Sequence, residues 1–253
     1  MNLRLYFAHN GDKLKARLFP AILILTLASL ACNLPLPTPP AVASPSPTRA
    51  LPPAVTATWT PLAAPHYFFE EEFAGDFLGW STVVTRGEAD LLDLQTKNGA
   101  LVFDIGGKKL NAFSLFQGGL YKDVRIDARL VSPDEAGFAA NLICRYSKGE
   151  GWYQFEVFNS GLFNLYHMKW DEHLSPVSTL LARGGSSAMR SDANVLTMLC
   201  KERMLSLYIN GQAAITYEEN QYALALGQVG LGVSSFDEIP IVVSFDWVKL
   251  AAP

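Results

Sequence analysis

The sequence predicts an all-β protein in which antiparallel strands form a two-sheet sandwich. Apolar and polar residues alternate with a period of two over residues 100–105, 123–130 and 153–157, as expected for half-buried strands. Glycine-containing turn signals recur between such runs, at the spacing typical of a sandwich. No segment keeps a helical apolar spacing for more than two turns. We therefore expect about a dozen strands in one domain, residues 66–253.

The composition separates this domain from what precedes it. Of the 15 prolines, ten lie between Pro35 and Pro65. The 188 residues that follow contain 15 Lys and Arg against 23 Asp and Glu, a formal net charge of −8. This acidic balance argues against nucleic-acid binding, which needs a basic face. Abundant aromatic and β-branched residues after Tyr67 argue against disorder in the domain.

Residues 1–31 have the pattern of a secretory signal. A basic stretch, 1–17, precedes the uncharged run LFPAILILTLASLA, residues 18–31. As a helix this run would measure about 21 Å, against roughly 30 Å for a bilayer core. The segment Leu27–Cys32, L-A-S-L-A-C, resembles a bacterial lipoprotein signal, which ends in a small residue before the lipidated cysteine, although Ser29 stands where leucine is usual.

This resemblance implies that Cys32 is lipidated and that the protein is exported and anchored to the cell membrane, facing the periplasm or the exterior. Two alternatives stay open: ordinary cleavage after Ala31, and retention of the run as a short membrane helix. Residues 32–65 are rich in Pro, Ser, Thr and Ala, and predict a disordered tether. In polyproline II form it would extend about 3.1 Å per residue as a spacer; a docking motif or an O-glycosylated stalk are the alternatives.

Two further features belong to the domain. Residues 204–217 predict a hairpin, because Asn210-Gly211 supplies a type I′ turn between two apolar runs. Cys144 and Cys200 each lie in an apolar strand, and an exported context predicts a disulfide between them. Two buried thiols are the alternative, and no neighbouring cysteine or histidine pair suggests a metal site at either one.

The order of these motifs resembles the concanavalin A-like lectin/glucanase domains. Within that group the sequence is most similar to laminin-G-like and 3-keto-disaccharide hydrolase-like domains of bacterial surface proteins. The resemblance is carried by the following motifs: Glu72-Phe73 with Gly79-Trp80, Leu142–Tyr146, Trp152–Val157, Gly161–Leu165, Asn194–Thr197, Leu207–Gly211, Gly227–Leu231 and Val243–Val248. It implies an antiparallel jelly-roll β-sandwich, whose curved sheet usually carries the ligand on its outer face.

Strand phase predicts which residues share that face. If Tyr153, Phe155 and Val157 point to the core, their neighbours on the same strand point outward. The same reasoning on the adjoining strands collects amides, charges and flat aromatic rings, which are the groups that bind sugars. The predicted ligand-binding residues are Asn141, Arg145, Trp152, Gln154, Glu156, Asn164 and Tyr166. The alternative is a solvated face with an Arg145–Glu156 cross-strand pair.

No catalytic residue is predicted. Hydrolysis of a glycoside needs two carboxylates, and the laminarinase-like branch carries them as Glu-x-Asp-x-x-Glu on one strand. The closest match, 88–93, ends in aspartate and lies near the start of the domain. His167 and His173 flank an acidic turn and are expected to be solvated, and no nucleophile elbow is present.

A structural calcium is the one cofactor that the resemblance suggests. Such domains often bind it near the chain ends, where Glu72, Asp76 and Asp246 could supply oxygen ligands. Turn capping by Asp76 and a surface ion pair at Asp246 form the alternative. The function most favoured is non-catalytic binding of a glycan or cell-wall polymer by a lipid-anchored envelope protein. A glycoside-active enzyme of the 3-keto-disaccharide hydrolase type and a structural or adhesion module that binds protein are the alternatives.

Overall fold

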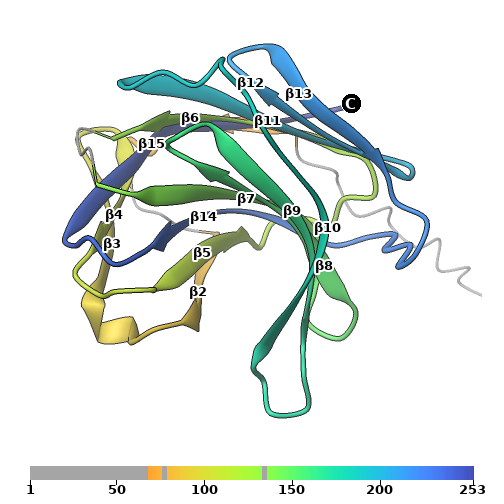
Figure 1. Ribbon diagram of the computed structural model, residues 1–253, viewed down its shortest axis with the longest axis horizontal. Coiled ribbons are helices and arrows are strands. Elements are labelled where there is room, and N and C mark those ends of the chain that lie inside the picture. The colour runs from red at the N-terminus through yellow and green to blue at the C-terminus, as the bar shows by residue number, and fades with distance from the viewer. Residues whose placement is uncertain (1–67, 76–78, 133–135) are drawn as a thin grey trace, which may run out of the picture. The chain divides into compact units, whose positions relative to one another are not determined.

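The computed structural model describes residues 68–75, 79–132 and 136–253. Within them the chain forms fifteen strands and one 3-10 turn, η1 (Ala89–Leu91), so the all-β prediction is confirmed (Figure 1). The strands are β1 (Phe69–Glu71), β2 (Trp80–Arg86), β3 (Leu92–Lys97), β4 (Ala100–Ile105), β5 (Asn111–Phe116), β6 (Val124–Val131), β7 (Phe138–Ser147), β8 (Gly151–Phe158), β9 (Leu162–Trp170), β10 (Pro176–Gly185), β11 (Ala193–Lys201), β12 (Met204–Ile209), β13 (Gln212–Glu218), β14 (Gln228–Ser235) and β15 (Ile241–Ala251).

The strands form two sheets. The eight-stranded sheet has the order β13-β12-β11-β6-β15-β4-β3, with β1 also paired to β15. The seven-stranded sheet has the order β10-β9-β8-β7-β14-β5-β2. All of these pairings are antiparallel, and most neighbours are distant in sequence, as in a jelly roll. The seven-stranded sheet is curved, so its outer face is concave (Figure 1).

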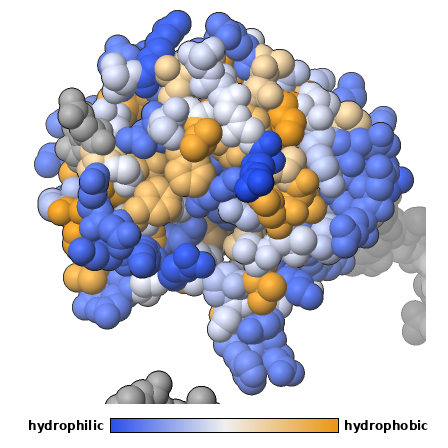
Figure 2. Space-filling view, in the orientation of Figure 1, coloured by the Kyte–Doolittle hydropathy of each residue, from blue (hydrophilic) through white to orange (hydrophobic). Residues whose placement is uncertain are grey.

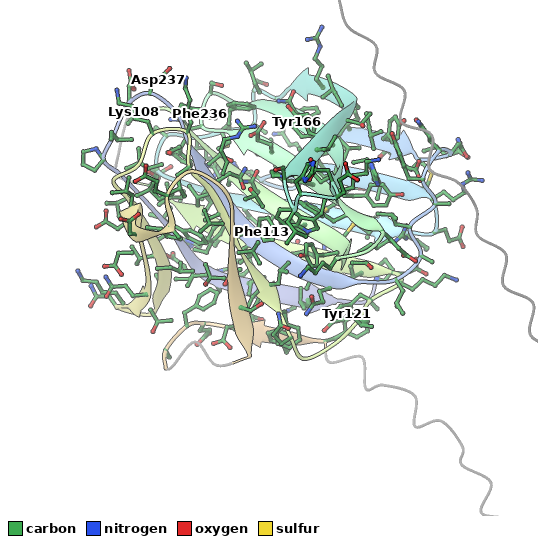
Figure 3. All side chains as sticks on the ribbon, turned by 90° about the horizontal axis from the view of Figure 1, so that it is seen from below. Lys108, Phe113, Tyr121, Tyr166, Phe236 and Asp237 are labelled. Atoms are coloured by element: carbon green, nitrogen blue, oxygen red, sulfur yellow. A yellow bond between two sulfur atoms is a disulfide. The ribbon has the colours of Figure 1, made fainter. Side chains whose placement is uncertain are left out.

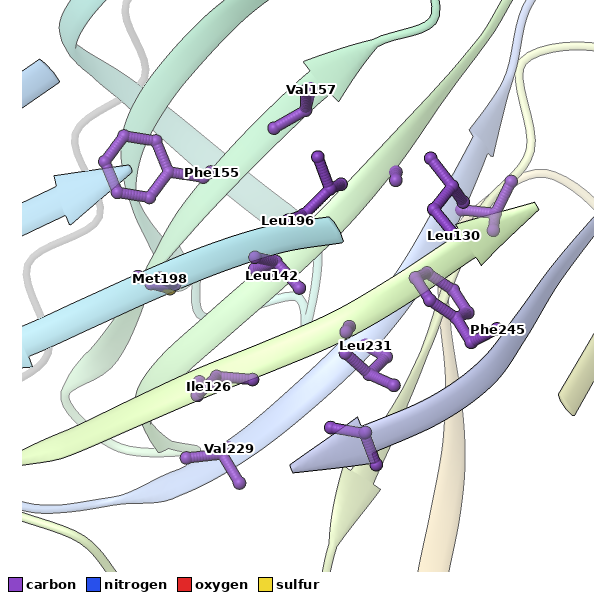
Figure 4. Packing of buried hydrophobic residues seen from close by; sticks show 14 of the residues in the cluster. Ile126, Leu130, Leu142, Phe155, Val157, Leu196, Met198, Val229, Leu231 and Phe245 are labelled. Carbon is purple, nitrogen blue, oxygen red and sulfur yellow. The ribbon is translucent and has the colours of Figure 1, made fainter. Parts of the chain in front are cut away.

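The main core lies between the sheets, where the period-two pattern places apolar side chains. On β8 the side chains of Tyr153, Phe155 and Val157 face this core, as the strand phase predicts. Figure 4 shows Ile126 and Phe245 of the eight-stranded sheet packed near residues of the other sheet. Full burial of such side chains contributes about 1.5–3 kcal/mol each.

Asn210 and Gly211 have φ values of 50° and 78°, which a type I′ turn requires, so the predicted hairpin is confirmed as β12–β13. The signal, the tether and Cys32 lie outside the described residues, as does Asp76. In the part of the chain that is described, no helix is long and apolar enough to cross a membrane.

The predicted disulfide is confirmed, and it connects the two sheets. Cys144 of β7 is bonded to Cys200 of β11, with a Cα–Cα distance of 6.8 Å. Both side chains are fully buried in the main core. The two residues are 56 positions apart, so the bond closes a long loop in the unfolded chain. It therefore stabilises the sandwich mainly by restricting the unfolded state.

We predict that the double variant Cys144→Ala/Cys200→Ala loses roughly 3–4 kcal/mol of the free energy of unfolding, because the loop-closure entropy returns to the unfolded chain. Denaturant titration followed by tryptophan fluorescence measures this change. Cys32→Ser is the matched control, since it replaces a cysteine outside the sandwich. A double variant as stable as the control would contradict the prediction.

Candidate functional site

A cleft of about 280 Å³ opens on the concave face of the seven-stranded sheet. Its floor comes from β8, one side from β9 and β10, and the other side from β2, β5 and the loop after β14. The surface view in Figure 2 shows hydrophilic and hydrophobic patches close together around a hollow. The residues that line the cleft are Thr85, Arg86, Asn111, Gln154, Glu156, Phe158, Asn164, Tyr166, Met168, Pro176, Ser178 and Phe236.

The rest of the concave face is covered by a second apolar cluster. Phe113, Leu115, Ile143 and Trp152 are buried there, and Trp170 packs against them. The Trp152 ring lies 5.8 Å from that of Phe113 and 5.3 Å from that of Trp170, measured between centroids. Aromatic pairs at such distances add about 0.5–1.5 kcal/mol beyond area burial. The covered half gives the cleft a rigid side.

Glycines on β14 let this apolar cluster close. A Cβ on Gly232 would lie 2.6 Å from the Cβ of Phe113, and one on Gly230 would lie 2.9 Å from Leu115. Real Cβ atoms do not approach so closely, so any larger residue would displace these side chains. The Gly-x-Gly pattern of β14 is therefore a packing requirement of the concave face.

A chain of hydrogen bonds runs beneath the cleft from β8 through β7 to β14. Trp152 Nε1 donates to Gln154 Oε1 at 3.1 Å, and Gln154 Nε2 donates to Asn141 Oδ1 at 2.9 Å. Asn141 Nδ2 then donates to Ser234 Oγ at 2.9 Å. These groups are buried, so each bond also removes the cost of an unpaired polar atom.

A second set of bonds reaches Ser234 from the other side of the sheet. Thr85 Oγ1 donates to Asn111 Oδ1 at 3.0 Å, and Asn111 Nδ2 donates to Ser234 Oγ at 2.8 Å. Ser234 thus accepts from two amides, and it also acts to lower the pKa of the neighbouring Glu156 carboxylate. The two sets of bonds therefore meet at Ser234, next to Glu156.

Glu156 is the carboxylate of the cleft. Burial raises its pKa above the ordinary value, while hydrogen bonds from Asn164 and Ser234 and the charge of Arg86 act in the opposite direction. Asn164 Nδ2 donates to Glu156 Oε2 at 3.1 Å. The pKa of Tyr166 is also raised, first by burial and then by the negative charge of Glu156. The cleft therefore contains four side chains that act on one another: Glu156, Asn164, Tyr166 and Arg86.

The structure divides the seven predicted ligand-binding residues into three groups. Gln154, Glu156, Asn164 and Tyr166 line the cleft. Asn141 and Trp152 belong to the same face, but both are fully buried beneath it. Trp152, although predicted as a ligand-binding residue, offers no exposed ring to a ligand, because Phe113 and its neighbours cover the indole.

The expected position of Arg145 is also wrong. The register of β7 against β8 shifts between Cys144 and Ser147, and Arg145 has a φ of 54°, so the alternation breaks at this residue. Its guanidinium donates to the carbonyl oxygens of Lys122, Leu224 and Glu202 at 2.7–2.9 Å. Asp123 Oδ1 is its ion-pair partner, at 3.5 Å. Arg145 thus ties three loops together, and the expected pair with Glu156 is not formed.

Several residues of the cleft escape the sequence-based reasoning. Arg86, Asn111 and Thr85 come from β2 and β5, which lie at the opposite end of the sheet from β9 and β10. Only the sheet order and its curvature bring them to the same cleft. Figure 3 looks toward this face, with Phe113 near its middle and both Tyr166 and Phe236 on one side. Phe236 stacks on Phe158, with ring centroids 5.5 Å apart.

The remaining candidate residues lie away from the cleft. Within the described residues no group of three or more His, Cys, Asp or Glu could hold a metal ion. Glu72 is exposed, and Asp246 forms an ion pair with Arg129 at 3.0 Å, while Asp76 is outside the described ranges. The 88–93 segment forms η1 and the start of β3, in the other sheet.

The two histidines of the acidic turn have different surroundings. His173 is exposed, as expected. His167 was expected to be solvated as well, but it is buried on the inner side of β9 and stacks on Tyr222 with ring centroids 3.5 Å apart. Burial lowers the pKa of His167, which favours its neutral form.

Comparison with solved structures identifies the fold. The chain resembles a lichenase derived from a mouse hindgut metagenome (TM-score 0.54, 11% identity, 74% of this chain and 99% of that chain). It also resembles a Bacillus subtilis protein with a galectin-like fold (0.54, 8%, 73% and 94%). A third is the carbohydrate-binding module CBM66 from Bacillus subtilis (0.50, 14%, 69% and 96%). No protein-family model and no curated protein matches the sequence. The chain has the concanavalin A-like jelly-roll fold.

The raised pKa of Glu156 predicts that the free energy of unfolding depends on pH. Because its pKa is raised in the folded protein, the ionised form destabilises the fold at pH 7, and this cost disappears as the pH falls toward 4. We predict that Glu156→Gln unfolds at a higher denaturant concentration than the wild type at pH 7, and that the difference shrinks at pH 4.

Glu219 provides the control of opposite sign. Burial acts to raise its pKa, but hydrogen bonds from Tyr153 and from three backbone N–H groups lower it overall. Glu219→Gln should therefore be less stable than the wild type at pH 7, with the loss diminishing as the pH falls. If both variants changed stability in the same direction at pH 7, the assigned shifts would be incorrect.

Proposed function

We propose that this protein is a lipid-anchored envelope protein whose sandwich binds a glycan, without cleaving it, in the cleft around Glu156. The observation that carries the proposal is the convergence of Glu156, Asn164, Tyr166 and Arg86 on one concave surface. Sugar hydroxyls both donate and accept hydrogen bonds. A carboxylate, an amide, a phenol and a guanidinium together provide matching acceptors and donors.

The hydrogen-bonded chain beneath the cleft supports this function. It ends at Ser234, which acts on the pKa of Glu156, and Asn164 holds the Glu156 carboxylate by a hydrogen bond. A carboxylate held in this way is already oriented before a ligand arrives, which lowers the entropic cost of binding. The Tyr166 ring and the Phe158–Phe236 stack add flat apolar surface, which suits the C–H face of a pyranose ring.

The number of carboxylates in the cleft favours binding over hydrolysis. Glu156 is the one carboxylate among the described residues that line it. Glycoside hydrolases generally use two, at about 5–5.5 Å or 6.5–9.5 Å. The structural neighbours include both a carbohydrate-binding module and glucanases, so the fold itself is compatible with either activity.

The predicted signal and the tether concern the position of the domain in the cell envelope. A lipid on Cys32, followed by the proline-rich segment, would hold the glycan-binding domain at a distance from the membrane. Such a placement suits a protein that contacts a polymer of the cell wall or of the surroundings.

We predict that the purified protein is retained by at least one polysaccharide in affinity electrophoresis, and that Glu156→Ala weakens this retention about tenfold, because a charge-assisted hydrogen bond is lost. Asn164→Ala should also weaken it. Glu88→Ala is the matched control, because it removes an exposed carboxylate that lies just before η1 and does not line the cleft. Equal retention of all variants would remove the cleft from consideration, and release of sugar products would contradict the non-catalytic role.

We predict that Cys32→Ser moves the protein from the membrane fraction to the soluble exported fraction, because the variant lacks the atom that carries the lipid. Detergent phase partitioning of the wild type and the variant measures this change. Ser29→Ala is the control, since it changes the signal but keeps the cysteine. A variant that stays in the detergent phase as the wild type does would contradict lipid anchoring at Cys32.

A further inference from the structure

The charge of the concave face differs from that of the domain around it. The domain is acidic, with a formal net charge of −8 over residues 66–253. The described residues that line two hollows of the concave face, by contrast, include two arginines and a single carboxylate. Arg86 lines the cleft, and Arg183 lines a second hollow of about 510 Å³. The two hollows have Phe158 and Asn164 in common, so they adjoin, and together they are called the groove.

Neither arginine is held by a hydrogen bond or an ion pair of the protein. In the described part of the chain, the guanidinium groups of Arg86 and Arg183 have no hydrogen bond and no ion pair within 4 Å, and both residues are exposed. Arginines of the other sheet are different: Arg125 is paired with Asp127, and Arg129 with Asp246. The free donors of the groove are therefore left for a ligand.

The strand register gives the spacing of these groups. Arg183 of β10 is directly opposite Asn164 of β9, which is directly opposite Glu156 of β8. Their outward-facing side chains form one row across the sheet, and Arg183 is about 10 Å from Glu156 along it. The charge of Arg86 acts on Glu156, whereas Asn164 separates Arg183 from Glu156 in this row. The groove thus carries a positive end that an electrically neutral sugar would leave unpaired.

We propose, on the basis of the proposed function, that the ligand is an acidic polysaccharide, and that Arg183 binds a uronate carboxylate of the chain while Glu156 accepts hydroxyl hydrogen bonds from a neighbouring sugar. A guanidinium presents a planar pair of N–H donors that matches a carboxylate, and the pairing is stronger than a hydrogen bond between neutral groups. The length of the row between the two side chains suits a polymer better than a single sugar.

The test compares uronate polymers with their own neutral forms. Polygalacturonate, alginate and hyaluronan are each offered to the full-length protein in affinity electrophoresis, next to the same polymer after chemical reduction of its carboxylates to alcohols. We expect at least one native polymer to bind about tenfold more tightly than its reduced form, with an affinity that falls as salt is raised. Binding that survives reduction unchanged overturns the proposal.

Single-residue variants test whether the carboxylate of the ligand binds at Arg183. Arg183→Gln should lose most of the difference between the native and the reduced polymer, while it keeps the affinity for the reduced form. Arg190→Gln is the matched control, because this exposed arginine lies in the loop between β10 and β11 and outside the groove. An Arg183→Gln protein that still discriminates as the wild type does overturns the proposal.

The outcome also separates this proposal from the proposed function. Binding of neutral glycans alone, abolished by Glu156→Ala, would leave the glycan-binding function in place and refute the acidic ligand. Failure to bind any native, reduced or neutral polysaccharide would refute both.

Discussion

Ser234 is the position on which the concave face depends. Its hydroxyl oxygen accepts from Asn111 on one side and from Asn141 on the other. A hydroxyl oxygen has two lone pairs, and both are used in this arrangement. The amides are then fixed in orientation, since each Nδ2 must donate to the serine. Five strands of the sheet become connected through side chains in addition to their backbone ladders.

The apolar half of the same face makes this arrangement possible. Trp152 begins the hydrogen-bonded chain, and its indole is held in place by Phe113 and Trp170. The glycines of β14 allow that packing. One half of the face is therefore apolar and closely packed, and the other half is open and polar. Rigid support beneath a polar surface is what a pre-organised binding site requires.

The sequence predicts the parts of this site that depend on local alternation. β8 and β9 are consecutive strands of regular register, so strand phase alone places Gln154, Glu156, Asn164 and Tyr166 on one face. The disulfide between Cys144 and Cys200 follows from composition and context, and the structure confirms it. Period-two reasoning is reliable wherever a strand continues without interruption.

The same reasoning fails where alternation breaks or where distant strands meet. The positive φ of Arg145 turns its side chain toward three loops, and nothing in the run Cys144-Arg-Tyr-Ser-Lys148 predicts a bulge there. The burial of Trp152 depends on Phe113, which is 39 positions away along the chain. Arg86 reaches the cleft only through the order and the curvature of the sheet. Contacts of this kind belong to the tertiary fold.

The observed positions of the arginines determine the charge of the concave face. Arg145 is buried and donates hydrogen bonds to three carbonyl oxygens of the fold, so it is not available to a ligand. Arg86 and Arg183 are exposed on the concave face. Removing Arg145 from that face does not make it acidic, because the two other arginines replace it from strands at opposite ends of the sheet. The groove therefore keeps a positive end on an acidic domain, and the burial of Glu156 beside it raises the pKa of the one carboxylate that would oppose an anionic ligand.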